Sequence, residues 1–520
     1  MAESRRHNEG LDLEQEREIL GRLETLNAIG VALSSERDTA TLLERILEAA
    51  RDFADADGGT LYSVKDGTLV FEVIRNDSLG YRMGGRSGQK IDFAPLPLYD
   101  ADGSGNDTMV VVKAALSGKT VNIPDAYAAE GFDFSGTRAF DARTGYRSQS
   151  FLTVPMKDHT GSVIGVLQLI NAKRKDGSVR PFSKSDQQLV ESLASQAAIV
   201  LNNRQLIQQL EVLFESLIEL INTAIDEKSP YTGGHCKRVP TLTMMLAESA
   251  NNATAGPLAD FRMSEKDRYE LKIAGLLHDC GKITTPVHVV DKATKLHTLF
   301  DRVELLETRF ELLRRDAEIA MLRGGLDEAG YAAELAAIEA DRALVRKSNT
   351  GGEFMDDAQV AAIQALAKRE LRGADGSTHP FLSADELENL TIRRGTLTSA
   401  ERGIINHHIV MTIRMLEALP WPAHLTQVPE YAGGHHERMD GKGYPRGLTR
   451  EQMSVQARVM GIADIFEALT AKDRPYKKGK TLSESLAILG RMKQGGHIDP
   501  DLFDIFVRER VYLRYAREFL

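Results

Sequence analysis

Histidines and carboxylates gather in five short stretches of the second half of this sequence. They are His235 in PYTGGH, His278 and Asp279 in LLHDCGK, His407 and His408 in INHHIV, His435 and His436 in GGHHERMDGKGYP, and Asp464 in GIADIFEA. Divalent metals in hydrolytic sites take imidazole and carboxylate ligands, and helices hold such ligands rigidly. The pattern predicts a metal centre built from distant segments, although a single histidine is more often an ordinary hydrogen-bonded residue.

Spacing restricts which of these side chains can act together. His407 and His408 point about 100° apart on a helix, so only one can belong to a shared ligand face. Asp464 lies in an otherwise apolar helical stretch, where burying an ionisable group is costly unless a partner or a metal compensates. His278 and Asp279 follow an apolar helical run, so both can reach one metal where that helix ends.

The elements that must carry these residues are predicted to be helices of a C-terminal domain spanning 223–520. Residues 301–346 are rich in Glu, Arg, Ala and Leu, which predicts two long solvated helices that turn near Gly324 and Gly325. We interpret about 300–395 as a helical arm inserted into this domain. Packing of low specificity is favoured over a partner-binding surface for the arm.

The first half of the chain has a different pattern. A polar segment, 1–21, precedes residues 22–205, where a helical repeat is followed by strand-like runs such as GTLYSV and LVFEVI. The run SFLTVPMKDHTGSVIGVLQLINA predicts a β-hairpin with Gly161 free to adopt a positive φ in the turn. These features predict an α/β domain.

A helix is expected to connect the two halves, because residues 186–228 lack Gly and Pro and keep helical periodicity. The apolar residues that repeat at heptad spacing are Ile199, Leu206, Leu210, Leu213, Leu217 and Leu220. We assign 206–222 to a connecting helix and a possible coiled coil, which would make the protein a parallel homodimer. An amphipathic helix packed on its own domain is the alternative.

Size and composition set the broad class. A chain of 520 residues exceeds the size of a single hydrophobic core, so two or three domains are expected. A net charge of −10 argues against a nucleic-acid polymer as partner, although the basic run Arg474–Lys480 could hold a small phosphate ligand.

The N-terminus is polar and no long apolar stretch is present, which predicts a cytoplasmic protein without a membrane span. Cys236 and Cys280 are expected to be small buried hydrophobes rather than ligands.

The α/β half resembles the GAF domain family of small-molecule sensors. The resemblance is carried by TGYRSQSFLTVPM, by the hairpin, and by Asn171 followed by Phe182-Ser-Lys-Ser-Asp186. It implies an antiparallel sheet flanked by helices and a small-molecule ligand of unknown identity. The lysine that follows the asparagine in cyclic-nucleotide-binding members is displaced here to Lys173, which argues against that ligand. A GAF domain that serves only dimerisation is the alternative.

The order and the amino-acid sequences of the histidine-containing stretches resemble those of the HD-GYP family of phosphohydrolases over about 223–296 and 396–510. The string HHERMDGKGYP is the most specific part. The resemblance implies an all-α HD-type bundle that holds two or three metal ions, with iron or manganese favoured. It also implies hydrolysis of cyclic di-GMP to linear pGpG and in some members to GMP. Two nearby metal ions suit this chemistry, because they activate water and neutralise phosphoryl charge.

Residue roles follow from the resemblance, position by position. Asp279 would bridge the metals, Lys282 would contact phosphate or protonate the leaving oxygen, and Arg474 and Lys477 would hold phosphate. The implied metal ligands are His235, His278, Asp279, His408, His435, His436 and Asp464. His408 is preferred over His407 because HIVMTIRML aligns better from the second histidine.

Two departures from the family shape the expectation. Three-metal members carry a carboxylate where this chain has Tyr231, so we expect two divalent ions. The long arm raises the alternatives of another cyclic dinucleotide or another phosphate ester as substrate, or of a receptor that binds nucleotide without turnover. The loop Gly441–Pro445 is interpreted as shaping the site. That loop and the arm are also possible surfaces for a protein partner.

Overall fold

A computed structural model describes residues 27–520 apart from 34, 37, 88, 229–233, 352–353, 374 and 473–478. The chain divides into two compact units, Met1–Leu213 and Phe214–Leu520. The boundary lies within the 45-residue helix α5 (Lys184–Lys228). None of the described helices is both long enough and apolar enough to cross a membrane.

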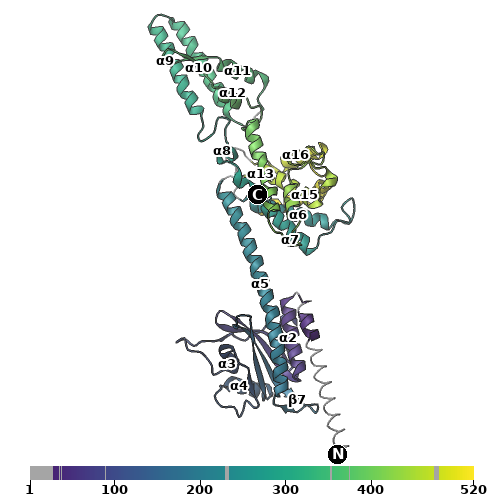
Figure 1. The fold of residues 1–520 in the computed structure, drawn as a ribbon. Helices are drawn as coiled ribbons and strands as arrows, with labels where there is room; N and C mark the ends of the chain where they lie inside the picture. The colour runs from purple at the N-terminus through teal and green to yellow at the C-terminus, as the bar shows by residue number, and fades with distance from the viewer. Residues whose placement is uncertain are drawn as a thin grey trace, which may run out of the picture. The chain divides into compact units, whose positions relative to one another are not determined.

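An antiparallel sheet forms the first unit (Figure 1). Its strands follow the order β3 (Tyr81–Gly84), β2 (Thr68–Asn76), β1 (Ala56–Lys65), β7 (Val163–Lys173), β6 (Phe151–Lys157) and β5 (Val121–Ile123), with β4 (Leu96–Pro97) paired to β2 and β8 (Val179–Arg180) paired to β7. The predicted hairpin is confirmed as β6 and β7, in which Thr153 pairs with Gln168 and Gly161 has φ 87°.

Helices cover both faces of this sheet, because side chains alternate between the faces along each strand. Leu61 of β1 packs in one core with α2 (Thr39–Phe53) and the beginning of α5. Its neighbour Tyr62 packs in another core with α3 (Val110–Ser117). Helix α4 (Ser135–Thr144) lies near α3 in Figure 1. The α/β fold with an antiparallel sheet is therefore confirmed.

Helix α5 presents two apolar faces. Ile218 and Ile225 are buried in the core of the second unit. The heptad residues named above, from Ile199 to Leu220, are exposed, and Leu213 retains 66% of its accessible surface. The helix thus packs on its own domain through one face and leaves the heptad face uncovered in the single chain.

The second unit is helical, as expected. Its elements other than the arm are α6 (His235–Asn251), α7 (Glu265–Leu277), η2 (Cys280–Thr284), α8 (Val287–Val290), α13 (Ser399–Glu417), α14 (Val428–Gly433), η3 (Arg450–Gln452), α15 (Val455–Thr470), α16 (Leu482–Gln494), α17 (Pro500–Arg508) and α18 (Val511–Phe519). One core joins α6, α7, α14, α15 and the C-terminal helices, with Phe466 and Tyr515 fully buried.

The arm is more than the two solvated helices predicted. Helices α9 (Val303–Leu322) and α10 (Glu328–Asn349) do form an antiparallel pair that turns at Gly324 (Figure 1). They are joined by α11 (Asp357–Ala367), the hairpin of β9 (Glu370–Arg372) and β10 (Thr378–Pro380), and α12 (Ala384–Leu390). Phe310 and Phe381 pack with their ring centroids 4.6 Å apart inside a separate core. Helical periodicity alone did not predict the separate core of the arm, because residues after 350 complete that core.

Candidate metal centre

Helix ends bring the predicted ligands together. His235 is the first residue of α6, His278 and Asp279 directly follow α7, and His435 and His436 come one residue after the end of α14. His408 lies within α13 and Asp464 within α15. Residues at or just beyond a helix end are held by the helix, yet their side chains can converge on a shared point.

The first group contains His235, His278, Asp279 and Asp464. The Asp279 Oδ2 atom lies 3.1 Å from His235 Nε2 and 3.2 Å from His278 Nε2. The Asp464 Oδ1 atom lies 3.4 Å from His235 Nε2. His235, His278 and Asp279 are all buried and can direct one ligand atom each to a common ion.

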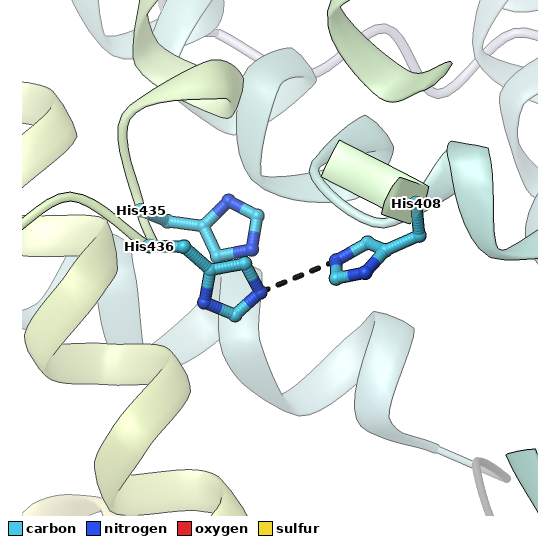
Figure 2. A group of neighbouring side chains, drawn as sticks. All are labelled: His408, His435 and His436. Atoms are coloured by element: carbon cyan, nitrogen blue, oxygen red, sulfur yellow. Dashed lines mark hydrogen bonds between the residues drawn. The ribbon is translucent and has the colours of Figure 1, made fainter. Parts of the chain in front are cut away.

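The second group contains His408, His435 and His436 (Figure 2). Nε2 of His436 lies 3.2 Å from Nε2 of His408, and the rings of His435 and His436 lie 4.1 Å apart between centroids. Asp279 joins the two groups, because its Oδ1 atom lies 3.2 Å from His408 Nε2 while Oδ2 faces the first group. Asp279 therefore has the geometry of a bridging carboxylate.

Three of the histidines have their Nδ1 atoms engaged with backbone carbonyls away from the centre. Nδ1 of His278, His408 and His435 lies 2.6 to 2.8 Å from the backbone carbonyls of Gly275, Ile405 and Ala432 respectively. A carbonyl only accepts, so Nδ1 donates and Nε2 is the ring nitrogen that faces the centre. This tautomer control is typical of metal-ligating histidines.

The donor set fits metal ions. The Nε2 atoms of His278 and His235 approach to 3.4 Å, and those of His408 and His436 to 3.2 Å. When both rings of a pair are neutral and donate through Nδ1, their Nε2 lone pairs face one another, and a cation between them removes the repulsion. His435 Nε2 and Asp279 Oδ1 are also buried without a hydrogen-bond partner, a costly state that a bound cation would relieve.

Electrostatics keep Asp279, His435 and His436 in the protonation states that metals require. Burial would raise the pKa of Asp279, but Lys282 and the neighbouring imidazoles hold it well below its ordinary value. Burial lowers the pKa of His436 to about 4 and that of His435 well below its ordinary value. The carboxylate is therefore ionised and both imidazoles are neutral at neutral pH.

Lys282 stands at the edge of this centre. Its Nζ donates to Asp279 Oδ2 at 2.5 Å, and its side chain keeps 28% exposure. Burial would lower the pKa of Lys282, but Asp279 and Asp464 raise it, so the amine remains protonated. A cation in this place can meet an anionic substrate.

Gly281 explains why the His-Asp turn can approach α13. A β-carbon at Gly281 would lie 2.0 Å from the His408 carbonyl oxygen, so no other residue fits without displacing the backbone. The Gly281 N–H also donates to Thr412 Oγ1 at 2.9 Å. This close approach places Asp279 against His408.

Glu467 is a site residue that the sequence reasoning missed. Its carboxylate is fully buried, and it accepts from His235 Nδ1 at 2.6 Å and from Arg238 Nε at 2.8 Å. It therefore orients His235 as the backbone carbonyls orient the other rings. A signal was available, because Glu467 is a second ionisable residue in the apolar stretch of Asp464, three residues later.

The loop after His436 is shaped by Glu437 and Gly443. The buried Glu437 carboxylate accepts from the backbone N–H groups of Arg446 and Leu448 at 2.7 and 2.9 Å. A β-carbon at Gly443 would come within 2.4 Å of the Glu437 Cα. The loop lays Tyr444 on the His436 ring, with centroids 4.8 Å apart. These contacts agree with the interpretation that the loop shapes the site.

His407 and the two cysteines fall outside the two groups. His407 is exposed and lines a surface hollow with Thr284 and Ile404. Cys236 and Cys280 are buried, and burial raises the pKa of the Cys280 thiol to about 11, so neither acts as an ordinary thiolate. Arg474, Lys477 and Tyr231 lie outside the described residues.

The first unit has a cavity of its own, about 550 Å³ in volume. Tyr62, Phe71, Tyr146 and Gln168 contribute to its wall. Among the described residues that line it, Arg75 is the only cation, and its guanidinium already pairs with Glu44. The cavity thus suits a small ligand with an apolar body and few polar atoms.

The motif around Asn171 is structural in this unit. Asn171, at φ 58°, accepts from the Gln149 and Ser150 N–H groups. The displaced Lys173 forms an ion pair with the buried Asp57. Asp186 pairs with Arg180 near the beginning of α5.

Comparison with known proteins assigns both units. Residues 38–201 match the GAF domain family, and residues 232–347 and 384–502 match two family models that are both described as HD domain. Both HD matches contain predicted ligands.

Similar proteins include several bacterial phosphodiesterases. The chain is 34% identical over 175 residues to Cyclic di-GMP phosphodiesterase PA4108 of Pseudomonas aeruginosa, covering 32% of this chain and 41% of that protein. It is 44% identical over 81 residues to 3'3'-cGAMP-specific phosphodiesterase 1 of Vibrio cholerae, covering 16% and 19%. It is 24% identical over 295 residues to 3'3'-cGAMP-specific phosphodiesterase 3 of the same organism, covering 56% and 38%. The chain spans less than half the length of each of these relatives.

The predicted pair of domain types is thereby confirmed. The GAF match covers the antiparallel sheet and its cavity, and the HD matches cover the helices that carry the histidines. The chain combines a GAF domain with an HD domain.

Proposed function

We propose that this protein is a metal-dependent phosphodiesterase that hydrolyses cyclic di-GMP to linear pGpG, with GMP as the product of any second hydrolysis. The carrying observation is the position of Asp279, whose two carboxylate oxygens face the two separate ligand groups. A bridged pair of divalent ions is the arrangement that suits phosphodiester hydrolysis. The names of the similar proteins and the resemblance to the HD-GYP family support the substrate class.

Separate residues of the chain would bind the metal ions and the substrate phosphate. His235, His278 and Asp464 would hold one ion, His408, His435 and His436 the other, and Asp279 both. We favour iron or manganese. Bound ions would supply Lewis-acid stabilisation of the phosphoryl group and lower the pKa of the attacking water. Lys282, protonated beside Asp279, would hold the substrate phosphate or donate its proton to the leaving 3'-oxygen.

The other parts of the chain would regulate this activity. We assign 22–205 to the sensor domain, 206–222 to the connecting helix and 223–520 to the catalytic domain with its arm. A small molecule would occupy the cavity of the GAF domain. The exposed heptad face of α5 would pair with a second copy, giving a homodimer.

A mixed cyclic dinucleotide is the second candidate substrate, because two of the similar proteins are named for 3'3'-cGAMP. The test incubates protein loaded with Fe, Mn, Co or Ni with either dinucleotide and quantifies the linear product. Asp279→Asn serves as the inactive control. Product from cyclic di-GMP at the higher kcat/KM supports the proposal. Absence of linear product from both substrates with all four metals would contradict it and favour a nucleotide receptor.

A further inference from the structure

The C-terminal part of α5 is built into the helical domain. Ile218 and Ile225 are buried in its core, and the Phe214 ring lies edge-on to Trp421 with centroids 6.2 Å apart. Glu215 of α5 forms an ion pair with Lys272 of α7 at 3.1 Å. The helix that leaves the GAF domain therefore ends as a packed element of the HD domain.

Lys228, the last residue of α5, holds the turn that carries Lys282. Its Nζ donates to the backbone carbonyls of Lys282, at 3.3 Å, and of Ile283. The same turn, η2, directs the Lys282 side chain to Asp279. The end of α5 is thus fixed to the backbone of the one cation that reaches the bridging carboxylate among the described residues.

Asp226, two residues earlier, contacts the beginning of α6. Its Oδ2 accepts from the N–H of Gly234 at 3.3 Å, and Gly234 is the N-cap residue of α6. His235 follows directly as the first residue of that helix. A carboxylate at a helix N-terminus is favourable, because it meets free N–H groups and the positive end of the helix dipole.

We propose that Asp226 and Lys228 are positioning residues for the reaction, through which the last turn of α5 sets the places of His235 and Lys282. The proposal rests on the proposed phosphodiesterase activity. Neither residue belongs to the ligand groups. Their effect is expected to be large because displacement of a reacting group by about 1 Å can lower a rate by about 100-fold.

The first test substitutes Lys228 in the full-length, metal-loaded protein. Lys228→Met is expected to lower kcat by about 10- to 100-fold with KM changed by less than about twofold, because Lys282 loses its alignment. Lys228→Arg keeps a donor and is expected to restore most of the rate. Lys272→Met removes another contact with α5 and is the matched control, with an unchanged rate.

The second test reads the metal geometry without turnover. In the Co²⁺-loaded protein, Asp226→Ala is expected to shift the visible absorption bands and to weaken Co²⁺ binding by about 10-fold, because the Gly234 N–H loses its acceptor and His235 is displaced. Glu219→Ala, on an exposed part of α5, is expected to leave the spectrum unchanged.

The outcomes separate this inference from the enzyme assignment. A wild-type rate for Lys228→Met, or equal losses for Lys228→Met and Lys272→Met, would overturn the role of Lys228. A wild-type Co²⁺ spectrum for Asp226→Ala would overturn that of Asp226. If the unsubstituted protein turns over no cyclic dinucleotide, the proposed activity fails, while the Co²⁺ spectra still decide whether Asp226 positions His235.

Discussion

Glu467 and His235 lie 232 residues apart in the chain, yet the buried Glu467 carboxylate accepts a hydrogen bond from His235 Nδ1 at 2.6 Å. The contact fixes the ring so that Nε2 faces Asp279 and Asp464. Burial and the three surrounding carboxylates act in opposite directions on His235, and the carboxylates raise its pKa well above the ordinary value. A metal ion would satisfy the same excess of negative charge.

Glu467→Gln is expected to weaken metal binding at the first group by about 10- to 100-fold, because the ring loses its charged acceptor. Competition between the protein and a chelator for Mn²⁺ measures this affinity. Glu451→Gln changes an exposed carboxylate and serves as control. An unchanged affinity in Glu467→Gln would show that the contact does not tune the metal.

Adjacent histidines in α13 provide a matched pair. His408→Ala is expected to remove one of two bound metal equivalents and to lower turnover by at least about 100-fold, because His408 faces both Asp279 and His436. His407→Ala changes the exposed neighbour and is expected to keep both metal equivalents and the turnover rate. Elemental analysis with a turnover assay measures the two effects. Equal metal content in the two variants would contradict the assignment of His408.

The Asp57–Lys173 pair predicts a pH dependence for the stability of the GAF domain. Burial would raise the pKa of Asp57, but bonds from Lys173, Tyr146 and Ser78 lower it below the ordinary 3.8. A carboxylate whose pKa is lower in the folded state than in the unfolded state stabilises the fold at pH values above its unfolded pKa. This stabilisation is lost as the pH falls through the folded-state pKa.

Asp57→Asn is therefore expected to lower the free energy of unfolding of the GAF domain by about 2 kcal/mol at pH 7. This difference in stability from the unsubstituted protein is expected to shrink below a pH of about 4. Calorimetric unfolding of the full chain at a series of pH values measures it. Asp52→Asn, at an exposed position of α2, is the control. A difference that stays constant down to pH 3 would contradict the prediction.

The exposed heptad face of α5 predicts the oligomeric state. Leu210→Lys combined with Leu217→Lys is expected to convert a dimer into a monomer, because charges in an apolar seam are costly to bury. Sedimentation velocity distinguishes the two species. Glu211→Lys, beside the seam, is expected to leave the dimer intact. A monomeric unsubstituted protein would show that this face does not pair.

Much of the architecture could be predicted from local pattern. Alternation and Gly161 predicted the β6–β7 hairpin, and the absence of Gly and Pro predicted α5, because these signals lie within a few residues. The arm was only half predicted. Its core needs Phe381 against Phe310, a pairing too distant for helical periodicity to reveal.

The sequence by itself determined the chemistry available to this protein, since the types and order of the histidines and aspartates indicate a metal centre before any fold is known. The family resemblance implied a bridging role for Asp279 and favoured His408 over His407, but only the tertiary structure decided that the two oxygens of Asp279 face separate ligand groups, with Oδ1 3.2 Å from His408 Nε2. It also brought Glu467 to His235 and the end of α5 to the turn of Lys282. These relationships depend on how helices pack, and Gly281 shows the reason, because its lack of a side chain matters only where α13 passes 2.0 Å from the place a β-carbon would take.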